Sequence, residues 1–257
     1  DPKGFLNKLH QMGLHVTLNL HPAEGIQPHE EMYPEAAAAL GKDEARHQRI
    51  PFDPANRHFL NVYFNDILHP REAEGVDFWW IDWQQHLTSN DTYGLSETFW
   101  CNHIFFNDMV RKRTDRRPVI FHRWGGLGSH RYQIGFSGDA LINFQTLGFQ
   151  PYFTATASNV GYGYWGHDLG GHAFTDESIV NDPELVLRWI QFGVFTPIFR
   201  THATNDARIE RRIWKFDNFP TMLEAVRLRY SLFPYLYTMA RKAYDTGISV
   251  CRPLYYE

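Results

Sequence analysis

Short apolar runs alternate along this chain with longer amphipathic stretches. The short runs end at Gly, Pro, Asn or Asp and are typical of buried strands, whereas the longer stretches carry apolar residues at helical spacing. Strand and helix in alternation indicate a parallel sheet with crossover helices, so the predicted fold class is α/β. The six strands that we predict lie at 15–20, 76–81, 118–122, 133–136, 160–165 and 197–201.

The amphipathic stretches predict helices between most of these strands. Asp1 and Pro2 are suited to begin the first helix and Gly13 to end it. Residues 21–52 are rich in Pro, Gly, Glu and Ala without a sustained apolar stripe, so we expect a long loop insertion that shapes a site. Further helices are expected at 54–68, 99–113, 141–158, 184–194 and, as one long helix, 220–244.

Composition and charge argue against several classes of protein. The 257 residues, of which 43% are apolar and 16% aromatic, suffice for one large hydrophobic core. A net charge of -4 with dispersed basic residues argues against a nucleic-acid partner. Cys101 and Cys251 lie far apart without CxxC spacing, so neither a zinc knuckle nor a disulfide framework is indicated. We see no apolar run long enough for a membrane span and no signal segment, and the cellular location is not indicated.

Two of the predicted strands end close to a carboxylate. Asp82 follows the strand at 76–81 directly, and Asp139 follows the strand at 133–136 after two residues. The carboxyl ends of parallel strands are where (β/α) barrels place their chemistry, and two carboxylates are the minimum for cleaving a glycosidic bond. We therefore predict Asp82 and Asp139 as catalytic residues. From spacing alone, Asp82 could equally end a strand, and Asp139 could cap the helix at 141–158.

The number of strands falls short of a closed barrel. A (β/α)8 TIM barrel has eight strands, whereas six are predicted here and the chain opens on a helix. We expect residues 1–257 to be one partial barrel that holds about strands 3 to 8. Because missing strands leave open β edges, we also expect this segment alone to hydrolyse little or nothing.

Four motifs follow one another along the chain. They are Trp80-Ile81-Asp82, Ser137-Gly138-Asp139, the stretch 166–171 that contains Asp168, and 188–193 with 197–202. In this order they resemble the catalytic barrel of glycoside hydrolase family 31, the α-glucosidase and α-xylosidase family, over nearly the whole chain. The resemblance implies a retaining, exo-acting α-glycoside hydrolase that cleaves terminal α-linked sugars from oligosaccharides or glycoconjugates, needs no cofactor, and carries flanking β domains.

The resemblance also assigns roles to single residues. It makes Asp82 the nucleophile and Asp139 the general acid/base, and it places Arg123 and His202 on sugar hydroxyls in the −1 subsite. A structural ion pair is the alternative for Arg123, a role in holding the glycine turn is the alternative for Asp168, and core packing is the alternative for the tryptophans. The other expected substrate-binding residues are Trp80, Trp83, Phe136, Trp165, Asp168 and His172.

Five positions depart from the common family pattern. Trp83-Gln84-Gln85 replaces Met-Asn-Glu after the nucleophile, Phe136 replaces a tryptophan, and His172 follows the paired glycines where the family has an aromatic residue. These positions line the sugar pocket in the family, so the sugar is not determined. An α-galactosidase or α-N-acetylgalactosaminidase type of specificity stays open.

Two other classes of function remain as alternatives. One is a non-catalytic carbohydrate-binding relative or an inactive fragment. The other is a metal-dependent barrel hydrolase, since imidazoles at strand ends can bind zinc. The histidines in question are His21, His122, His167 and His202. The oligomeric state is not indicated.

Overall fold

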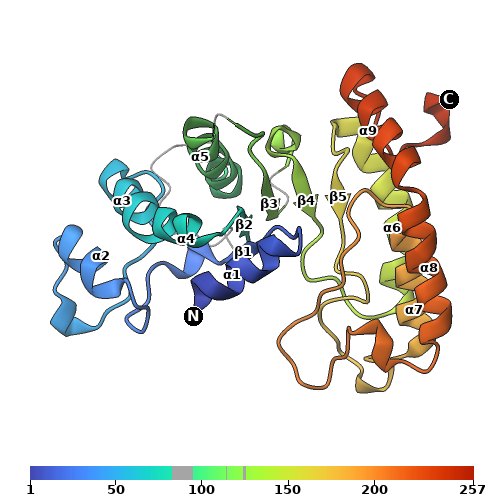
Figure 1. Cartoon of the computed structure of the whole chain (residues 1–257), viewed down its shortest axis with the longest axis horizontal. Helices are drawn as coiled ribbons and strands as arrows, with labels where there is room; N and C mark the ends of the chain where they lie inside the picture. Colours follow the sequence, from blue (N-terminus) through green and yellow to red (C-terminus); the bar gives the residue numbers. More distant parts are fainter. Residues whose placement is uncertain (83–94, 114, 124–125) are drawn as a thin grey trace. The chain divides into compact units, whose positions relative to one another are not determined.

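A computed structural model describes residues 1–82, 95–113, 115–123 and 126–257. These residues form two compact units, 1–126 and 127–257, which are described separately below (Figure 1). Trp83, predicted to bind substrate, lies outside the described residues, as do Gln84 and Gln85.

Unit 1 is built on three parallel strands. β1 (Thr17–Leu20) pairs with β2 (Phe78–Ile81), and β2 pairs with β3 (Ile120–Arg123), so β2 lies in the middle. In the register Leu20 lies beside Ile81, which in turn lies beside His122. Because all three strands run the same way, their carboxyl ends meet at one edge. The predicted strands at 15–20, 76–81 and 118–122 are confirmed.

The helices of unit 1 follow the predicted order with shifted ends. Asp1 caps α1 (Pro2–Gln11) by accepting the N–H of Gly4, as predicted. The helix expected at 54–68 begins three residues later, because the side chain of Asn56 accepts the first free N–H groups. It consists of α3 (Arg57–Val62), a π-helical turn (Tyr63–Leu68) and α4 (His69–Glu74). The next helix is α5 (Glu97–Lys112).

The insertion at 21–52 has ordered structure of its own. Ile26 and Ile50 pair antiparallel and close the segment at its base. Within it lies α2 (Tyr33–Ala39), whose Tyr33 is 2% exposed and donates its hydroxyl to the carbonyl of Gln48 at 2.7 Å. The antiparallel pair and the buried Tyr33 therefore hold this segment together just beyond the end of β1.

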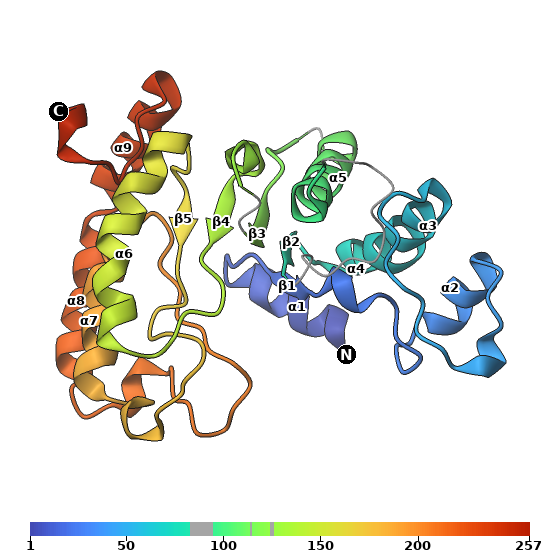
Figure 2. The same cartoon turned by 180° about the vertical axis from the view of Figure 1, so that it is seen from behind.

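Unit 2 begins with two short parallel strands. β4 (Ile134–Phe136) pairs with β5 (Trp165–Gly166), with Gly135 opposite Trp165. A Cβ at Gly135 would lie 2.5 Å from the Trp165 ring, so glycine is what allows the indole to pack on β4. The helices α6 (Phe144–Ala157), α7 (Pro183–Gly193) and α8 (Phe219–Ser231) lie side by side in both views (Figures 1 and 2).

Two predicted strands of unit 2 need correction. The strand expected at 160–165 is confined to β5, because a turn with Gly161 at φ +84° follows α6. The strand expected at 197–201 is wrong: only Thr201 forms a bridge, with Leu169. The Arg229 guanidinium binds the carbonyl of Pro197, the first residue of the expected strand, together with the carbonyls of Val194 and Thr196 just before it.

The long final helix expected at 220–244 is also wrong as a single element. α8 ends at Ser231, and α9 (Phe233–Thr246) begins after Leu232. Pro234 lacks the N–H that a continuous helix would bond to Tyr230, so the helix breaks there. Within the described part of the chain, we find no helix with both the length and the apolar character needed to cross a membrane.

Candidate active site

Asp82 lies immediately after β2, as its motif predicts. Its backbone N–H donates to the carbonyl of Leu20 at 2.8 Å, which extends the β1–β2 ladder by one residue and fixes the start of the side chain. The residue is 5% exposed. Asp82 is therefore a buried carboxylate at the carboxyl end of the central strand of unit 1.

Three side chains from the neighbouring strands surround this carboxylate. The guanidinium of Arg123, at the end of β3, donates from Nε to Oδ1 of Asp82. Asn19 on β1 donates from Nδ2 to Oδ2 at 3.3 Å, and Nε2 of His21 lies 3.8 Å from the same oxygen. Together these groups hold the carboxylate in one orientation. Asn19 was not predicted, although its place in the strand beside Asp82 is the signal that could have found it.

Arg123 therefore takes part in the ion pair considered as its alternative role. It is 7% exposed, and both members of the pair are buried. Trp80, two residues before Asp82 on β2, is 9% exposed and packs at a ring-centroid distance of 5.2 Å from Phe121. In a strand, residues two apart share a face, so Trp80 and Asp82 lie on the same side of β2.

Asp139 follows β4 in unit 2. Gly138 precedes it at φ +77°, a left-handed conformation that glycine adopts without strain. The carboxylate side chain of Asp139 is 32% exposed. The cap of α6 is Asn143, whose side chain accepts the N–H of Thr146 at 2.7 Å, so the capping role considered for Asp139 belongs to another residue.

Asp168 lies two residues beyond β5 and is completely buried. Nη2 of Arg200 contacts its Oδ1, and Nδ1 of His172 lies 3.2 Å from its Oδ2. Burial raises the pKa of Asp168, but the contact with His172 and the charges of Arg200 and His202 outweigh burial and hold the pKa below its ordinary value. Arg200 was not predicted; its signal was its place two residues before His202 in the same motif.

His172 lies close to three of the predicted residues. Its Nε2 is 3.9 Å from Oδ1 of Asp139, its Nδ1 faces Asp168, and its ring centroid is 5.3 Å from that of His202. Unit 2 thus brings together Asp139, Asp168, His172 and His202. The preceding turn, Gly170–Gly171, has positive φ at both residues, which orients His172 toward this cluster.

Asp168, His172 and His202 are also close enough to share a cation, since their ligand atoms lie within 4.8 Å of one another. The guanidinium of Arg200 already contacts Asp168 and supplies a positive charge there. We therefore interpret the cluster as an ion-pair network. Of the four histidines proposed as a zinc set, His202 is the member found in this cluster.

The other predicted residues of unit 2 lie in its interior. His167 is 1% exposed and hydrogen-bonds Thr154 at 2.8 Å and Ser137 at 3.0 Å. Burial lowers the pKa of His167 to about 3, so the imidazole is neutral. Trp165 is 2% exposed, and Phe136 is fully buried with the Arg200 guanidinium 5.5 Å from its ring centroid.

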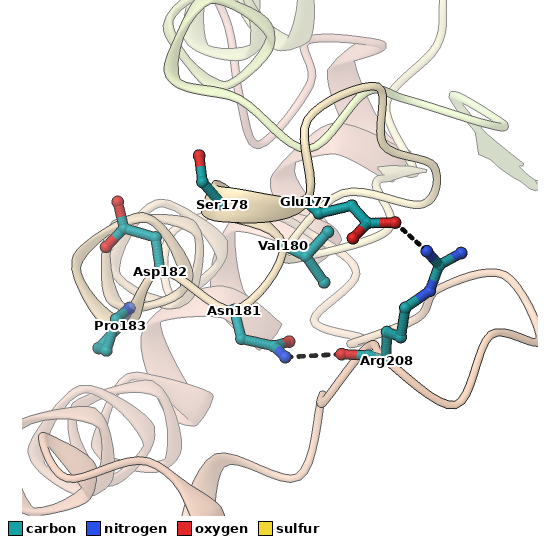
Figure 3. Close-up of a pocket in the computed structure, with 7 residues that line it drawn as sticks. All are labelled: Glu177, Ser178, Val180, Asn181, Asp182, Pro183 and Arg208. Carbon is teal, nitrogen blue, oxygen red and sulfur yellow. Dashed lines mark hydrogen bonds and ion pairs between the residues drawn. The ribbon is translucent and has the colours of Figure 1, made fainter.

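A separate pocket in unit 2, of about 470 Å³, is lined by none of the described site residues (Figure 3). At its rim Arg208 and Glu177 point toward one another and form an ion pair. Asn181 donates to the carbonyl of Arg208 at 2.6 Å and accepts the N–H of Glu210 at 2.8 Å. These contacts hold the segment that follows His202 against the residues just before α7.

Comparison with known proteins shows to which family the chain belongs. The family model described as the Glycosyl hydrolases family 31 TIM-barrel domain matches residues 1–239. The chain belongs to glycoside hydrolase family 31. The match confirms the predicted α/β TIM-barrel fold class and the resemblance on which the site residues were chosen, and it does not favour the metal-dependent alternative.

Relatives of this family 31 chain are longer proteins. It is 34% identical over 177 residues to a "Probable glucan 1,3-alpha-glucosidase" of Oryza sativa subsp. japonica, which covers 67% of this chain and 18% of that protein. It is 26% identical over 272 residues to an "Alpha-xylosidase" of Saccharolobus solfataricus, and this match covers 98% of this chain and 36% of that protein. The fold matches a family 31 α-xylosidase from a soil metagenome, crystallised with xylose, with a TM-score of 0.79 at 23% identity over 100% of this chain and 44% of the other.

Proposed function

We propose that the protein carrying this segment is a retaining α-glycoside hydrolase in which Asp82 is the nucleophile and Asp139 the general acid/base. The observation that carries the proposal is the placement of each carboxylate beyond the carboxyl end of a parallel strand, within a family 31 barrel sequence. Barrel enzymes place catalytic groups at this end of their strands. The proposal requires the two carboxyl groups to flank one scissile bond about 5–5.5 Å apart.

The difference between the two environments fits the two roles. Asp82 is buried and held by Arg123 and Asn19, as suits a carboxylate that must present one oxygen to an anomeric carbon. Asp139 has a side chain that is 32% exposed, and so can exchange a proton with a leaving oxygen and later with water. A fixed nucleophile and a more accessible acid are the arrangement that double displacement needs.

Catalysis then takes two steps. In the first, an oxygen of Asp82 forms a bond to the anomeric carbon while the bond to the glycosidic oxygen breaks, and Asp139 gives its proton to that oxygen. In the second, water attacks the glycosyl–Asp82 ester, Asp139 takes a proton from the water, and the sugar leaves with its original configuration. Both steps pass through a transition state with positive charge on the sugar ring, which the buried carboxylate of Asp82 stabilises.

For the substrate class, we infer a terminal α-linked sugar of an oligosaccharide or glycoconjugate. The matched relatives carry the names glucosidase and xylosidase, which favours α-glucosides and α-xylosides. His172 and Phe136 depart from the common family residues, so α-galactosides and α-N-acetylgalactosaminides belong in any screen.

The test is a screen of the full-length protein against aryl α-glycosides, with Asp82→Ala and Asp139→Ala variants. Asp115→Ala is the matched control, because its carboxylate is 74% exposed and outside the site. We expect each site variant to lose at least about 10²-fold in kcat on the preferred substrate, and the control to keep wild-type rates. Wild-type rates in Asp82→Ala would overturn the assignment of the nucleophile.

Two further measurements separate the roles. Proton NMR of the first-formed sugar should show the α-anomer, and the β-anomer would contradict retention. Azide should rescue Asp139→Ala by forming an α-glycosyl azide, since Asp82 remains to form the covalent intermediate. An Asp139→Ala enzyme that azide does not accelerate on any activated substrate would count against the acid/base role.

A further inference from the structure

Arg211 binds the glycine turn, Gly170–Gly171, in unit 2. Its Nη2 donates to the carbonyl of Gly170 at 2.8 Å and to that of Gly171 at 3.1 Å. Its Nη1 donates to the carbonyl of Glu210 at 2.6 Å and, at 3.4 Å, to that of Val180. One guanidinium therefore joins the glycine turn to two other segments of the unit.

The charge and the close approach of Arg211 suit this role. Burial lowers the pKa of Arg211 to about 10, while the charges of Glu210 and Asp168 act to raise it, so the guanidinium is a cation at neutral pH and every N–H is a donor. Gly170 has φ +101°, and a Cβ at this position would lie 2.8 Å from Cδ of Arg211 and closer still to Nε. The absence of a side chain at Gly170 is therefore what lets the guanidinium reach the turn.

The bond from Arg211 fixes the peptide group through which the chain enters His172. The oxygen of this group is the carbonyl of Gly171, which accepts from Arg211. Its nitrogen is that of His172, which donates to the carbonyl of Ala140 at 2.7 Å. A peptide group is planar, so a hydrogen bond at each end leaves it little freedom to rotate. The carbonyl of His172 in turn accepts the N–H of Thr204 at 3.1 Å, so the backbone of His172 is held on both sides.

This backbone determines where the ring of His172 lies among the predicted site residues. Nε2 of His172 is 3.9 Å from Oδ1 of Asp139, and the ring centroid is 5.3 Å from that of His202. Rotation of the preceding peptide group would redirect the Cα–Cβ bond of His172 and carry the ring away from both neighbours. The four hydrogen bonds of the Arg211 guanidinium go to main-chain carbonyls, so Arg211 acts on the ring through the backbone.

We propose that Arg211 is a positioning residue for sugar recognition: it fixes the peptide group before His172 and so places the His172 ring against the sugar. This inference rests on the proposed function and on the predicted contact of His172 with substrate. Contacts that distinguish one sugar from another need a defined distance, and a displacement of about 1 Å can cost about 10²-fold in rate. Arg211 thereby helps to determine which sugar the site accepts.

The test compares Arg211→Met with the wild type in the full-length protein. Met keeps much of the length of the side chain and removes the donors. The quantity measured is the sugar selectivity, which is kcat/KM for the best substrate among the nitrophenyl α-glucoside, α-galactoside and α-xyloside divided by kcat/KM for the next best. A loss of folded enzyme affects both values equally and leaves the ratio unchanged. We expect the ratio to fall by about 10-fold or more.

A double-mutant cycle shows whether Arg211 acts through His172. His172→Ala alone should lower the same ratio, because it removes the ring that Arg211 positions. Arg211→Met added to His172→Ala should then lower the ratio no further, since residues that act as one unit are not additive. Additive effects on the ratio would overturn the proposal, because Arg211 would then act independently of the ring.

Two further variants provide the comparison and the control. Arg211→Lys keeps a positive charge and N–H donors that reach fewer carbonyls, so the ratio should fall by less than in Arg211→Met. It also carries the test if Arg211→Met fails to fold. Arg212→Met is the matched control, because the neighbouring side chain is 61% exposed and pairs with Glu210, and it should match the wild type.

An unchanged ratio in Arg211→Met, or an equal fall in Arg212→Met, would overturn the proposal; if Arg211→Met does not fold, an unchanged ratio in Arg211→Lys would do so. If His172→Ala lowers the ratio and Arg211→Met does not, only the role of Arg211 falls. If His172→Ala leaves the ratio unchanged, the predicted substrate contact of His172 falls as well. The catalytic assignment is judged separately, by the loss of turnover in Asp82→Ala.

Discussion

The buried pair of Asp82 and Arg123 makes a quantitative prediction about stability. Replacing Arg123 by Met keeps the length of the side chain and removes its charge, which leaves the Asp82 carboxylate without its main partner. Both side chains are 8% exposed, so water cannot take the place of the guanidinium. Breaking a buried pair on one side costs about 3–5 kcal/mol.

The surroundings of Asp82 place the expected cost at the lower end of that range. Asn19 still donates to Oδ2 at 3.3 Å, and His21 lies 3.8 Å away, so part of the negative charge remains compensated. We therefore expect Arg123→Met to cost about 3 kcal/mol. For a domain of this size that lowers the Tm by about 6–12 °C.

Arg116→Met is the matched control for this experiment. Arg116 pairs with Asp77 in the same unit at 3.4 Å, but its side chain is 52% exposed. An exposed pair contributes about 0–1 kcal/mol, so the Tm should fall by less than about 4 °C. Thermal unfolding of both variants at neutral pH is the assay. Equal shifts in the two variants would refute the claim that burial makes the Asp82–Arg123 pair important.

Further predictions concern the interior of unit 2. The pKa of His167 is about 3 in the folded protein, against an ordinary 6.5. Between these two values the unfolded chain binds more protons than the folded one. The free energy of unfolding should therefore fall as the pH drops through this window, by about 3 kcal/mol at pH 4.5 relative to neutral pH. His167→Gln should flatten the dependence of Tm on pH; an unchanged slope would contradict this. Gly135→Ala should cost about 1–3 kcal/mol in thermal unfolding, because a methyl group meets the Trp165 ring. Gly148→Ala in α6 is the control, because a Cβ at this position meets no atom within 4 Å, and it should be neutral or stabilising. Comparable losses of stability in Gly135→Ala and Gly148→Ala would refute the argument.

The sequence predicts some parts of this fold better than others, because a local pattern of apolar residues determines some elements and contacts with distant residues determine others. The strands at 76–81 and 118–122 are short apolar runs with clear ends, and they pair with one another in unit 1. The run at 197–201 looks similar, but the guanidinium of Arg229 in α8 binds the carbonyl of its first residue, Pro197. No local pattern reveals a contact from an arginine so much further along the chain.

The break between α8 and α9 is a different kind of error. Apolar periodicity continues through 220–244 and predicts one helix, whereas Pro234 within it breaks the helix. The π-helical turn at Tyr63–Leu68 has no comparable signal. In this chain the proline determines where the helix ends, and the apolar periodicity does not.

For the candidate site, motifs located the carboxylates and missed some of their partners. Asp82 and Asp139 follow from strand ends and family motifs. Asn19 reaches Asp82 only because of the β1–β2 register, and Arg200 reaches Asp168 from a segment that is not a strand. Their places in a strand and in a motif mark both residues as candidates, but which carboxylate each one contacts depends on three-dimensional register and burial.

The central claim is that Asp82 and Asp139 act on opposite sides of one glycosidic bond. The most direct measurement is the separation of their carboxyl groups in an experimental structure of the full-length protein with a sugar bound. We predict about 5–5.5 Å, with the anomeric carbon beside Asp82 and the glycosidic oxygen beside Asp139. A separation of about 6.5–9.5 Å would contradict retention, and side chains that face different cavities would contradict the account as a whole.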